Sequence, residues 1–253
     1  MWYWTKVLFF ILLGAITVWL LYEVVTFPNI AKLKNENPTT SSLIEYRIAE
    51  TQSEGKTPRK NMIWQPIEQI SPNLQRAVLA GEDARFFEHD GFDWDSINKA
   101  WEEAQKEGEK EAKKEGDYNP DSWIPPMPKF KRGASTVTQQ LAKNLYLSED
   151  RNFLRKGREA AITYFLEKDL SKKRILELYL NVIEWGDGIY GAEAASRFYF
   201  KKSASNLSAA EAAYLSAMIP SPLNIFNPKK NPKRLRNRQR IIQRGMRHVR
   251  LQY

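Results

Sequence analysis

The sequence contains no cysteine and only two histidines, His89 and His248. The lack of cysteine excludes disulfide bonds, thiolate metal sites and a catalytic cysteine. Two histidines are too few for the multi-histidine sites that hold catalytic zinc. Any chemistry therefore has to come from carboxylates, lysine, arginine and neutral polar side chains.

Strict alternation of apolar and polar residues is also absent over any useful length. That alternation marks half-buried strands, so its absence predicts a mainly α-helical fold. The 253 residues are 42% hydrophobic and 27% charged, which excludes wholesale disorder and suits one large domain or two small ones.

Acidic residues are missing from Lys229–Arg250, which carries ten lysines and arginines, whereas the net charge of the whole chain is +9. Such a basic stretch indicates an anionic partner. Leu235, Ile241, Ile242 and Met246 are interleaved with the charges. Two interpretations stay open: a helix lying on anionic lipid headgroups, or a terminal helix that packs its apolar face on the domain.

Charge is absent from Val7–Tyr22, which reads VLFFILLGAITVWLLY. With its flanks, residues 1–25 reach the ~20 residues that span a bilayer and predict a single-pass transmembrane anchor. A cleaved signal peptide is the alternative, but the run is long and no small-residue cleavage site follows it. Lys6 precedes the span and Glu23 follows it, so the positive-inside rule predicts a cytoplasmic N-terminus and an external body.

Composition divides the rest of the chain. Residues 26–65 are polar and punctuated by proline, which predicts a stalk or linker. Residues 66–253 are predicted to form the domain. Within it, residues 102–131 are first highly charged and then rich in proline, which predicts a solvated surface insertion. Serine caps predict helix starts at Ser71 (followed by Pro72), Ser135, Ser171 and Ser208, the last in a capping box with Glu211.

Glu82 follows an apolar helical run and is surrounded in sequence by Phe86, Phe87 and Phe92. Aromatic neighbours would partly desolvate the carboxylate and suit it to acid–base chemistry near neutral pH. A surface acid at a helix end is the alternative.

Two further segments carry polar side chains at helical spacing. Gly133–Asn144 reads GASTVTQQLAKN and places Gln139 and Lys143 on one helical face, which suits sugar and phosphate. Arg151, Arg155 and Glu159 also share a face, and arginine forks bind phosphate. Taken alone, the first could be a capped polar helix and the second an exposed ion pair.

Together these segments resemble the motifs of glycosyltransferase family 51, the biosynthetic peptidoglycan glycosyltransferases. The resemblance covers roughly residues 60–250. This sequence departs from the family at Arg174, because the family often has an acidic residue near this position. The family pattern E-D-x-x-F-x-x-H-x-G matches Glu82, Asp83, Phe86, His89 and Gly91, and the pattern G-x-S-T-x-T-Q-Q-L-x-K-N matches residues 133–144. The pattern R-K-x-x-E matches Arg155, Lys156 and Glu159. The pattern K-x-x-I-L-x-x-Y-L-N matches residues 172–181, and residues 207–222 resemble the last motif of the family.

The resemblance implies an α-rich, partly lysozyme-like glycosyltransferase domain with a smaller membrane-facing lobe, of the monofunctional type. It implies polymerisation of lipid II into β-1,4 glycan strands with release of undecaprenyl pyrophosphate, at the periplasmic face of a bacterial inner membrane. Other cell-wall synthesis or division proteins are possible partners. A divalent cation, Mg²⁺ or Mn²⁺, is compatible with the family, although the sequence shows no metal site of its own.

The resemblance also assigns roles to residues. Glu82 is expected to be the base, and Glu159, the second catalytic carboxylate, is expected to hold the cluster of arginines and lysine in position or to assist at the donor phosphate. The residues expected to bind substrate are Asp83, His89, Ser135, Thr136, Gln139, Gln140, Lys143, Asn144, Arg151, Arg155 and Lys156.

Three other functions are alternatives. A lytic transglycosylase or lysozyme-like hydrolase would also use one glutamate, but it cleaves a neutral bond and has no need for a cluster of cations. An inactive scaffold would not need Glu82 and Lys143. A nucleic-acid binder is indicated only by the basic C-terminal stretch, and the predicted export of the domain argues against it.

Overall fold

The computed structural model describes residues 2–116, 118–119, 125–130, 135–148 and 152–253. The fold is mainly helical, as predicted. Its α-helices are α1 (Trp2–Val25), α2 (Ser42–Ser53), α3 (Pro72–Glu82), α4 (Trp94–Glu115), α5 (Val137–Tyr146), α6 (Phe153–Asp169), α7 (Lys172–Val182), α8 (Ala192–Phe200), α9 (Ala209–Met218) and α10 (Pro232–Gly245). The 3₁₀ helices are η1 (Ile30–Lys34), η2 (Ile67–Gln69), η3 (Ala204–Asn206) and η4 (Met246–His248).

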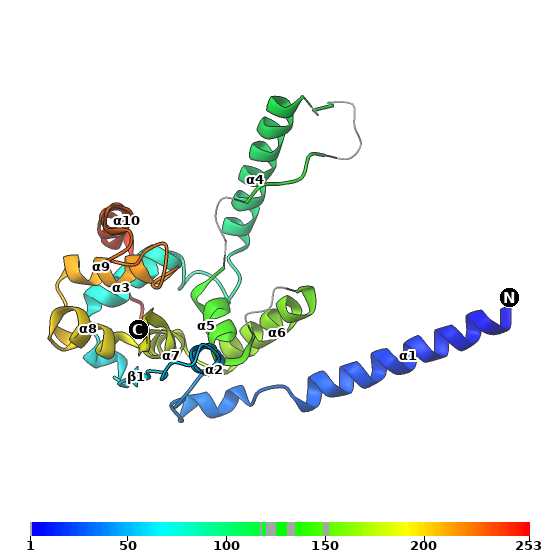
Figure 1. Cartoon of the computed structure of the whole chain (residues 1–253), viewed down its shortest axis with the longest axis horizontal. Coiled ribbons are helices and arrows are strands. Elements are labelled where there is room, and N and C mark those ends of the chain that lie inside the picture. Colours follow the sequence, from blue (N-terminus) through cyan, green and yellow to red (C-terminus); the bar gives the residue numbers. More distant parts are fainter. Residues whose placement is uncertain (1, 117, 120–124, 131–134, 149–151) are drawn as a thin grey trace.

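Helix α1 extends away from the folded body (Figure 1). Its apolar side chains, among them Phe9, Leu12 and Ile16, are exposed. A helix that is apolar on all sides requires either a protein core or a bilayer around it. By length and composition α1 is able to cross a membrane, which agrees with the predicted anchor.

Residues 26–65 do not form the predicted stalk. Ser42 Oγ in α2 donates a hydrogen bond to Leu145 O at 3.1 Å, and Arg174 Nε in α7 donates to Leu33 O at 2.7 Å. The basic residue at position 174 therefore ties this segment to the body. Composition was misleading here because a few apolar side chains are enough to dock a mostly polar segment. The buried ones are Ile30, Leu33, Leu43 and Ile44.

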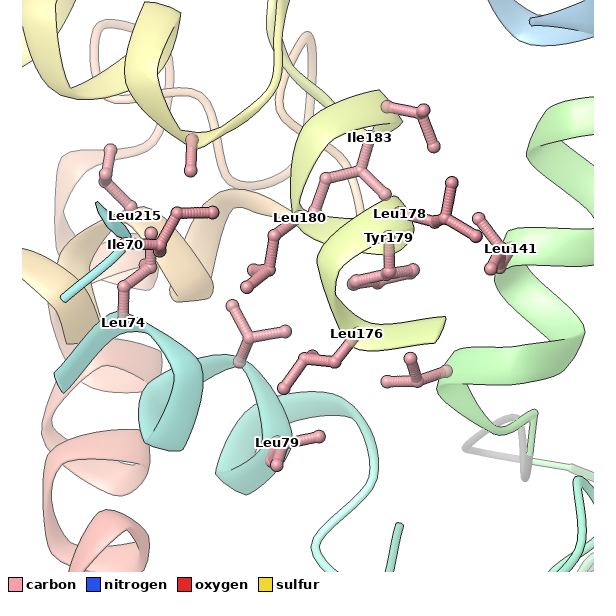
Figure 2. Close-up of a cluster of buried hydrophobic side chains, with 14 of the residues drawn as sticks. Ile70, Leu74, Leu79, Leu141, Leu176, Leu178, Tyr179, Leu180, Ile183 and Leu215 are labelled. Carbon is pink, nitrogen blue, oxygen red and sulfur yellow. The ribbon is translucent and has the colours of Figure 1, made fainter. Parts of the chain in front are cut away.

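Helix α7 lies at the centre of the core. Its side chains Leu176, Leu178 and Leu180 are fully buried and face neighbouring helices in different directions (Figure 2). A helix that is buried on several sides reads as a nearly continuous apolar run, which α7 has. Helix α5 packs on one side of it, with Leu141 in the contact. Leu79 of α3 lies near Leu176, whereas Leu74 of α3 lies beside Ile70 and Leu215 (Figure 2). The two helices that carry the family-like polar motifs are thereby fixed on the same core.

Helix starts agree with the predicted caps in three of four cases. Ser71, Ser171 and Ser208 each accept a hydrogen bond at the first turn of α3, α7 and α9, and Ser208 forms the capping box with Glu211. The prediction for Ser135 is wrong by one residue, because Thr136 caps α5. Thr136 is the cap because its side chain accepts a hydrogen bond from the Gln139 amide, while the Gln139 side chain accepts one from the Thr136 amide.

The strands are β1 (Asn61–Met62), β2 (Glu184–Gly186) and β3 (Ile189–Tyr190). They form a small sheet in the order β1-β3-β2, in which β3 pairs parallel to β1 and antiparallel to β2. Strands this short leave no alternating pattern to read in a sequence. Through the pairing of β1 with β3, the sheet joins residues 61–62, which precede the predicted domain boundary at residue 66, to the domain.

The charged part of the predicted insertion is helical. Helix α4 projects from the body (Figure 1), and residues 125–130 return along it. Lys129 N donates to Ala104 O at 2.9 Å, and the Trp101 and Phe130 rings lie 5.8 Å apart. The described part of this segment, 102–116 with 125–130, extends from the body, and the insertion over 102–131 stays a prediction.

Helix α10 packs its apolar stripe on the domain. Leu235 and Ile242 are buried, and α10 contacts α9 and α3. It lies on the opposite side of the body from α1 (Figure 1). Of the two open interpretations of the basic stretch, the packed terminal helix is the one observed.

The glycine that precedes α8, Gly191, lies close to the backbone of Asn181 at the end of α7. Gly191 has a φ of +81°, and an added Cβ would lie 2.6 Å from Asn181 O; Gly116, at the end of α4, has a φ of +79° with open space around it. We expect Gly191→Ala to cost about 2–4 kcal/mol, because it adds a clash to backbone strain.

Thermal melting in detergent, followed by circular dichroism, checks this. Gly116→Ala is the matched control, since it shares the strain without the clash. Equal melting temperatures for the two variants would contradict the close approach.

Candidate active site

A cleft of about 900 Å³ opens between α2, α3, α5, α7 and α10. Predicted residues that line it are Glu82, Ser135, Gln140, Lys143 and Asn144. Its far wall comes from the segment 219–224 and from α10. Glu82 of the first family-like motif and the lining residues of the second, which begin 53 residues later at Ser135 (135 − 82), thus face one space.

Glu82 is the last residue of α3, and its side chain is only 8% exposed. Gln140 Nε2 donates to Glu82 Oε2 at 3.0 Å, and Arg238 Nη2 donates to Glu82 Oε1 at 2.8 Å. Each oxygen of an ionised carboxylate can accept about two hydrogen bonds. Glu82 therefore keeps acceptor capacity for a hydroxyl that enters the cleft.

Burial raises the pKa of the Glu82 carboxyl above its usual range, and the charge of Asp83 acts in the same direction. The hydrogen bond from Gln140 and the guanidinium of Arg238 oppose this rise, because both stabilise the ionised form. A buried carboxylate with such partners can hold a proton taken from a hydroxyl and still be ionised beforehand.

Tyr179 fixes the orientation of the Gln140 amide. Its hydroxyl donates to Gln140 Oε1 at 2.7 Å, so that the Gln140 NH₂ group is turned toward Glu82. Burial raises the pKa of Tyr179 well above its usual value, which keeps the hydroxyl a donor. The core helix α7 thereby determines a hydrogen bond at the cleft.

Of the residues that the structure describes, three basic side chains line the cleft: Lys143 of α5, Arg47 of α2 and Arg238 of α10. Arg47 makes a two-pronged contact with Glu184, Nε to Oε1 at 3.0 Å and Nη2 to Oε2 at 3.2 Å. Lys143 lies in the last turn of α5, one helical step from Gln140. The cleft therefore combines one carboxylate base with positive charge on neighbouring helices.

Asp83 and His89 lie behind the cleft wall rather than on it. Asp83 Oδ1 is 2.9 Å from His89 Nε2, and Val137 N donates to Asp83 Oδ2 at 3.0 Å. The two side chains are 3% and 6% exposed. Asp83 thus joins the end of α3 to the start of α5, where its charge is favourable. The contact brings together the helices that carry Glu82 and Gln140.

Thr136 and Gln139 are used in the helix cap. Thr136 Oγ1 donates to Gly91 O at 2.7 Å, and Gln139 Oε1 accepts from Thr136 N at 3.0 Å. Both are buried, and neither lines the cleft. Ser135, one residue earlier, is exposed at the cleft edge.

The third motif forms an ion-pair cluster on α6. Arg155 Nη1 contacts Glu159 Oε2 at 3.0 Å, and Lys156 pairs with the other Glu159 oxygen. Glu159 is buried, whereas Lys156 is half exposed. These residues do not line the cleft around Glu82. Arg151 lies outside the described residues.

Sequence reasoning missed Arg238, Tyr179 and Arg47. A signal for Arg238 was available, because it lies between Leu235 and Ile242 at helical spacing and so interrupts the apolar stripe of α10. A charged residue on a buried stripe needs a partner. For Arg47 no signal existed, since it lies in the supposed stalk.

The residues around the cleft do not fit a metal held by protein alone. Within the described ranges, no three His, Asp or Glu side chains converge on a common point. Glu82 and Glu184 are each paired with an arginine. No reaction step is therefore assigned to a metal, and the divalent cation stays a prediction.

Comparison with known proteins gives a consistent match. The transglycosylase family profile matches residues 48–116 and 126–247. A Chromobacterium violaceum protein named biosynthetic peptidoglycan transglycosylase is 42% identical over 247 residues, 98% of this chain and 99% of the relative. A protein of the same name from Bordetella pertussis is 39% identical over 246 residues, 97% of this chain and 95% of the relative. Another from Thiobacillus denitrificans is 46% identical over 209 residues, 83% of this chain and 82% of the relative.

The position of Asp83 gives a prediction. We expect Asp83→Ala to cost about 2–4 kcal/mol of stability, because it leaves the Val137 amide without its acceptor and breaks a buried pair with His89. Asp90→Ala, an exposed acid in the same loop, is the control. The measurement is the melting temperature in detergent. An unchanged melting temperature together with weaker substrate binding would instead assign Asp83 to substrate contact.

Proposed function

This chain belongs to the transglycosylase family, and we propose that it is a membrane-anchored peptidoglycan glycosyltransferase that polymerises lipid II. The observation that carries the proposal is the buried Glu82 in a cleft that also holds Lys143. Relatives matched over nearly their whole length, named biosynthetic peptidoglycan transglycosylase, support the same reaction.

In the proposed reaction the 4-hydroxyl of the acceptor's N-acetylglucosamine attacks C1 of the donor's N-acetylmuramic acid. The new β-1,4 bond forms as the bond from C1 to the pyrophosphate oxygen breaks, with inversion. Glu82 takes the hydroxyl proton, and undecaprenyl pyrophosphate carries away the electron pair. A hydroxyl is a weak nucleophile and needs a base, whereas pyrophosphate leaves readily and needs positive charge more than a proton.

The hydrogen bonds at Glu82 favour a base over an acid. A lytic enzyme needs this carboxyl protonated, so that it can donate to a poor leaving group. Burial raises the pKa of Glu82, but Arg238 and Gln140 both donate to its oxygens and oppose that rise by stabilising the ionised form. This arrangement supports synthesis rather than cleavage.

Lys143 is proposed to stabilise the developing charge on the pyrophosphate. It lies on the cleft wall beside Asn144 and Ser135, which are suited to bind sugar or phosphate oxygens. On the neighbouring helix α6, Arg155 and Lys156 are proposed to bind the donor phosphates, with Glu159 holding them in place. Helix α5 packs on α6, so both groups belong to one side of the body.

Helix α1 is proposed to cross the inner membrane with the N-terminus in the cytoplasm and the body in the periplasm. Glu23 Oε2 accepts from Arg158 Nη1 at 2.7 Å, and the Phe27 and Phe165 rings lie 5.2 Å apart, which supports a retained anchor docked on α6. Phe153 and Leu154 are exposed at the start of α6. This end of the body is proposed as the membrane-facing lobe. Other cell-wall proteins as partners remain a prediction.

Glu82→Gln tests the base. We expect polymerisation to fall by about 10²–10⁴-fold, because the amide cannot accept the proton. Lipid II binding should largely survive, since the side chain keeps its shape. Labelled lipid II with full-length protein in detergent, resolved on a gel, gives the rate.

Glu88→Gln is the control, because Glu88 is an exposed acid six residues away that does not line the cleft. A near-normal rate for Glu82→Gln would remove Glu82 from the reaction. Release of fragments from preformed peptidoglycan, with no polymer from lipid II, would favour the lytic alternative.

Lys143→Ala tests the phosphate site. We expect both the maximal rate and the apparent affinity for lipid II to fall by at least about tenfold, because a charge-assisted contact to the leaving group is lost. Initial rates over a range of lipid II concentrations give both values. Lys114→Ala, an exposed lysine on α4, should behave as the unmodified protein. Unchanged kinetics for Lys143→Ala would contradict the assignment.

A further inference from the structure

We propose that Arg238 is a positioning residue that keeps the Glu82 carboxylate ionised and aimed into the cleft. The proposal rests on the proposed function, because it concerns the base of that reaction. Arg238 comes from the terminal helix α10, whose basic residues otherwise face solvent at the surface of the body.

The guanidinium of Arg238 is held by contacts on several sides. Its Nη2 donates to Glu82 Oε1 at 2.8 Å and to Gly81 O at 3.0 Å, and its Cζ lies 5.3 Å from the centre of the Phe226 ring. The side chain is 26% exposed. An arginine held by a carboxylate, a carbonyl and a ring has little freedom, so it fixes the carboxylate that it contacts.

The backbone around the contact is built for close approach. A Cβ at Gly81 would lie 2.8 Å from Ser216 Oγ of α9 and 3.0 Å from Ile242 Cδ1 of α10. The absence of a side chain at Gly81 therefore lets α10 approach α3 closely enough for Arg238 to reach Glu82.

Among the described residues, Arg238 is the cation that opposes the effect of burial on the pKa of Glu82, together with the hydrogen bond from Gln140. Burial and Asp83 disfavour the ionised carboxylate, whereas Arg238 favours it. Tyr179 stays a neutral donor and acts only through Gln140. Charged and titratable groups around the cleft are Asp83 on α3, Lys143 on α5, Tyr179 on α7, Arg238 on α10, and the mutually paired Arg47 on α2 and Glu184 on β2.

The alternative role for Arg238 is a direct contact with the pyrophosphate. The two roles differ in their dependence on pH. If Arg238 acts through Glu82, its loss lowers the rate at acidic pH and the rate recovers as pH rises and the carboxyl ionises. If Arg238 binds phosphate, its loss lowers the rate by a similar factor at every pH.

The experiment is the pH dependence of the polymerisation rate at saturating lipid II, with full-length protein in detergent. For Arg238→Gln we expect the midpoint of the acidic limb to move up by about 1–3 pH units, the range by which a nearby opposite charge lowers a carboxyl pKa. Arg238→Lys, which restores charge but not the fork, should lie between Arg238→Gln and the unmodified protein. Arg240→Gln, an exposed arginine on the same helix, is the matched control and should leave the limb unmoved.

An acidic limb that stays in place in Arg238→Gln, with a uniform loss of rate, would overturn the proposal. If that variant does not fold, as judged by its melting curve, Arg238→Met is a second neutral variant to which the same two outcomes apply. Failure of the proposed function is a separate result, because then the unmodified protein would make no polymer from lipid II at any pH.

Discussion

A single buried carboxylate constrains the arrangement of the helices around it. Glu82 stands at the end of α3 with little access to water, and an unpaired charge there would be costly. Gln140 of α5 and Arg238 of α10 satisfy its two oxygens. Both donors must arrive from elements far apart in the chain. Their positions depend in turn on Asp83, which ties α5 to α3, and on Gly81, which lets α10 approach.

The same chain of contacts joins the core to the cleft. Tyr179 belongs to the central helix α7, and through Gln140 it decides which end of an amide faces Glu82. The polar motifs of the sequence therefore divide by position. Gln140, Lys143 and Asn144 face the cleft, whereas Thr136 and Gln139 cap the helix that presents them. The run 136–144 serves both purposes because successive helical residues point in different directions.

Much of this could be predicted from sequence, and the failures have physical causes. Serine caps and the apolar run of α7 are local signals, so the helix starts at Ser71, Ser171 and Ser208 were predictable. The docking of 26–65 was not, because it depends on tertiary contacts such as that of Arg174 with Leu33 O. Glu82 was identified through the family resemblance, since its burial is created by helices that no local pattern relates to it.

The basic C-terminal stretch shows how one pattern can carry two roles. Nearly all of its charges lie in solvent, and composition describes them well as a surface property. Arg238 differs from the other basic residues in its position around the helix. It shares a helical face with Leu235 and Ile242, which are buried against the domain. A charge placed there is stable only if the domain supplies an anion, and the anion available is the proposed base. The fold of the terminal helix and the ionisation of the carboxylate are therefore coupled, so that a change in the packing of α10 alters the charge state of Glu82.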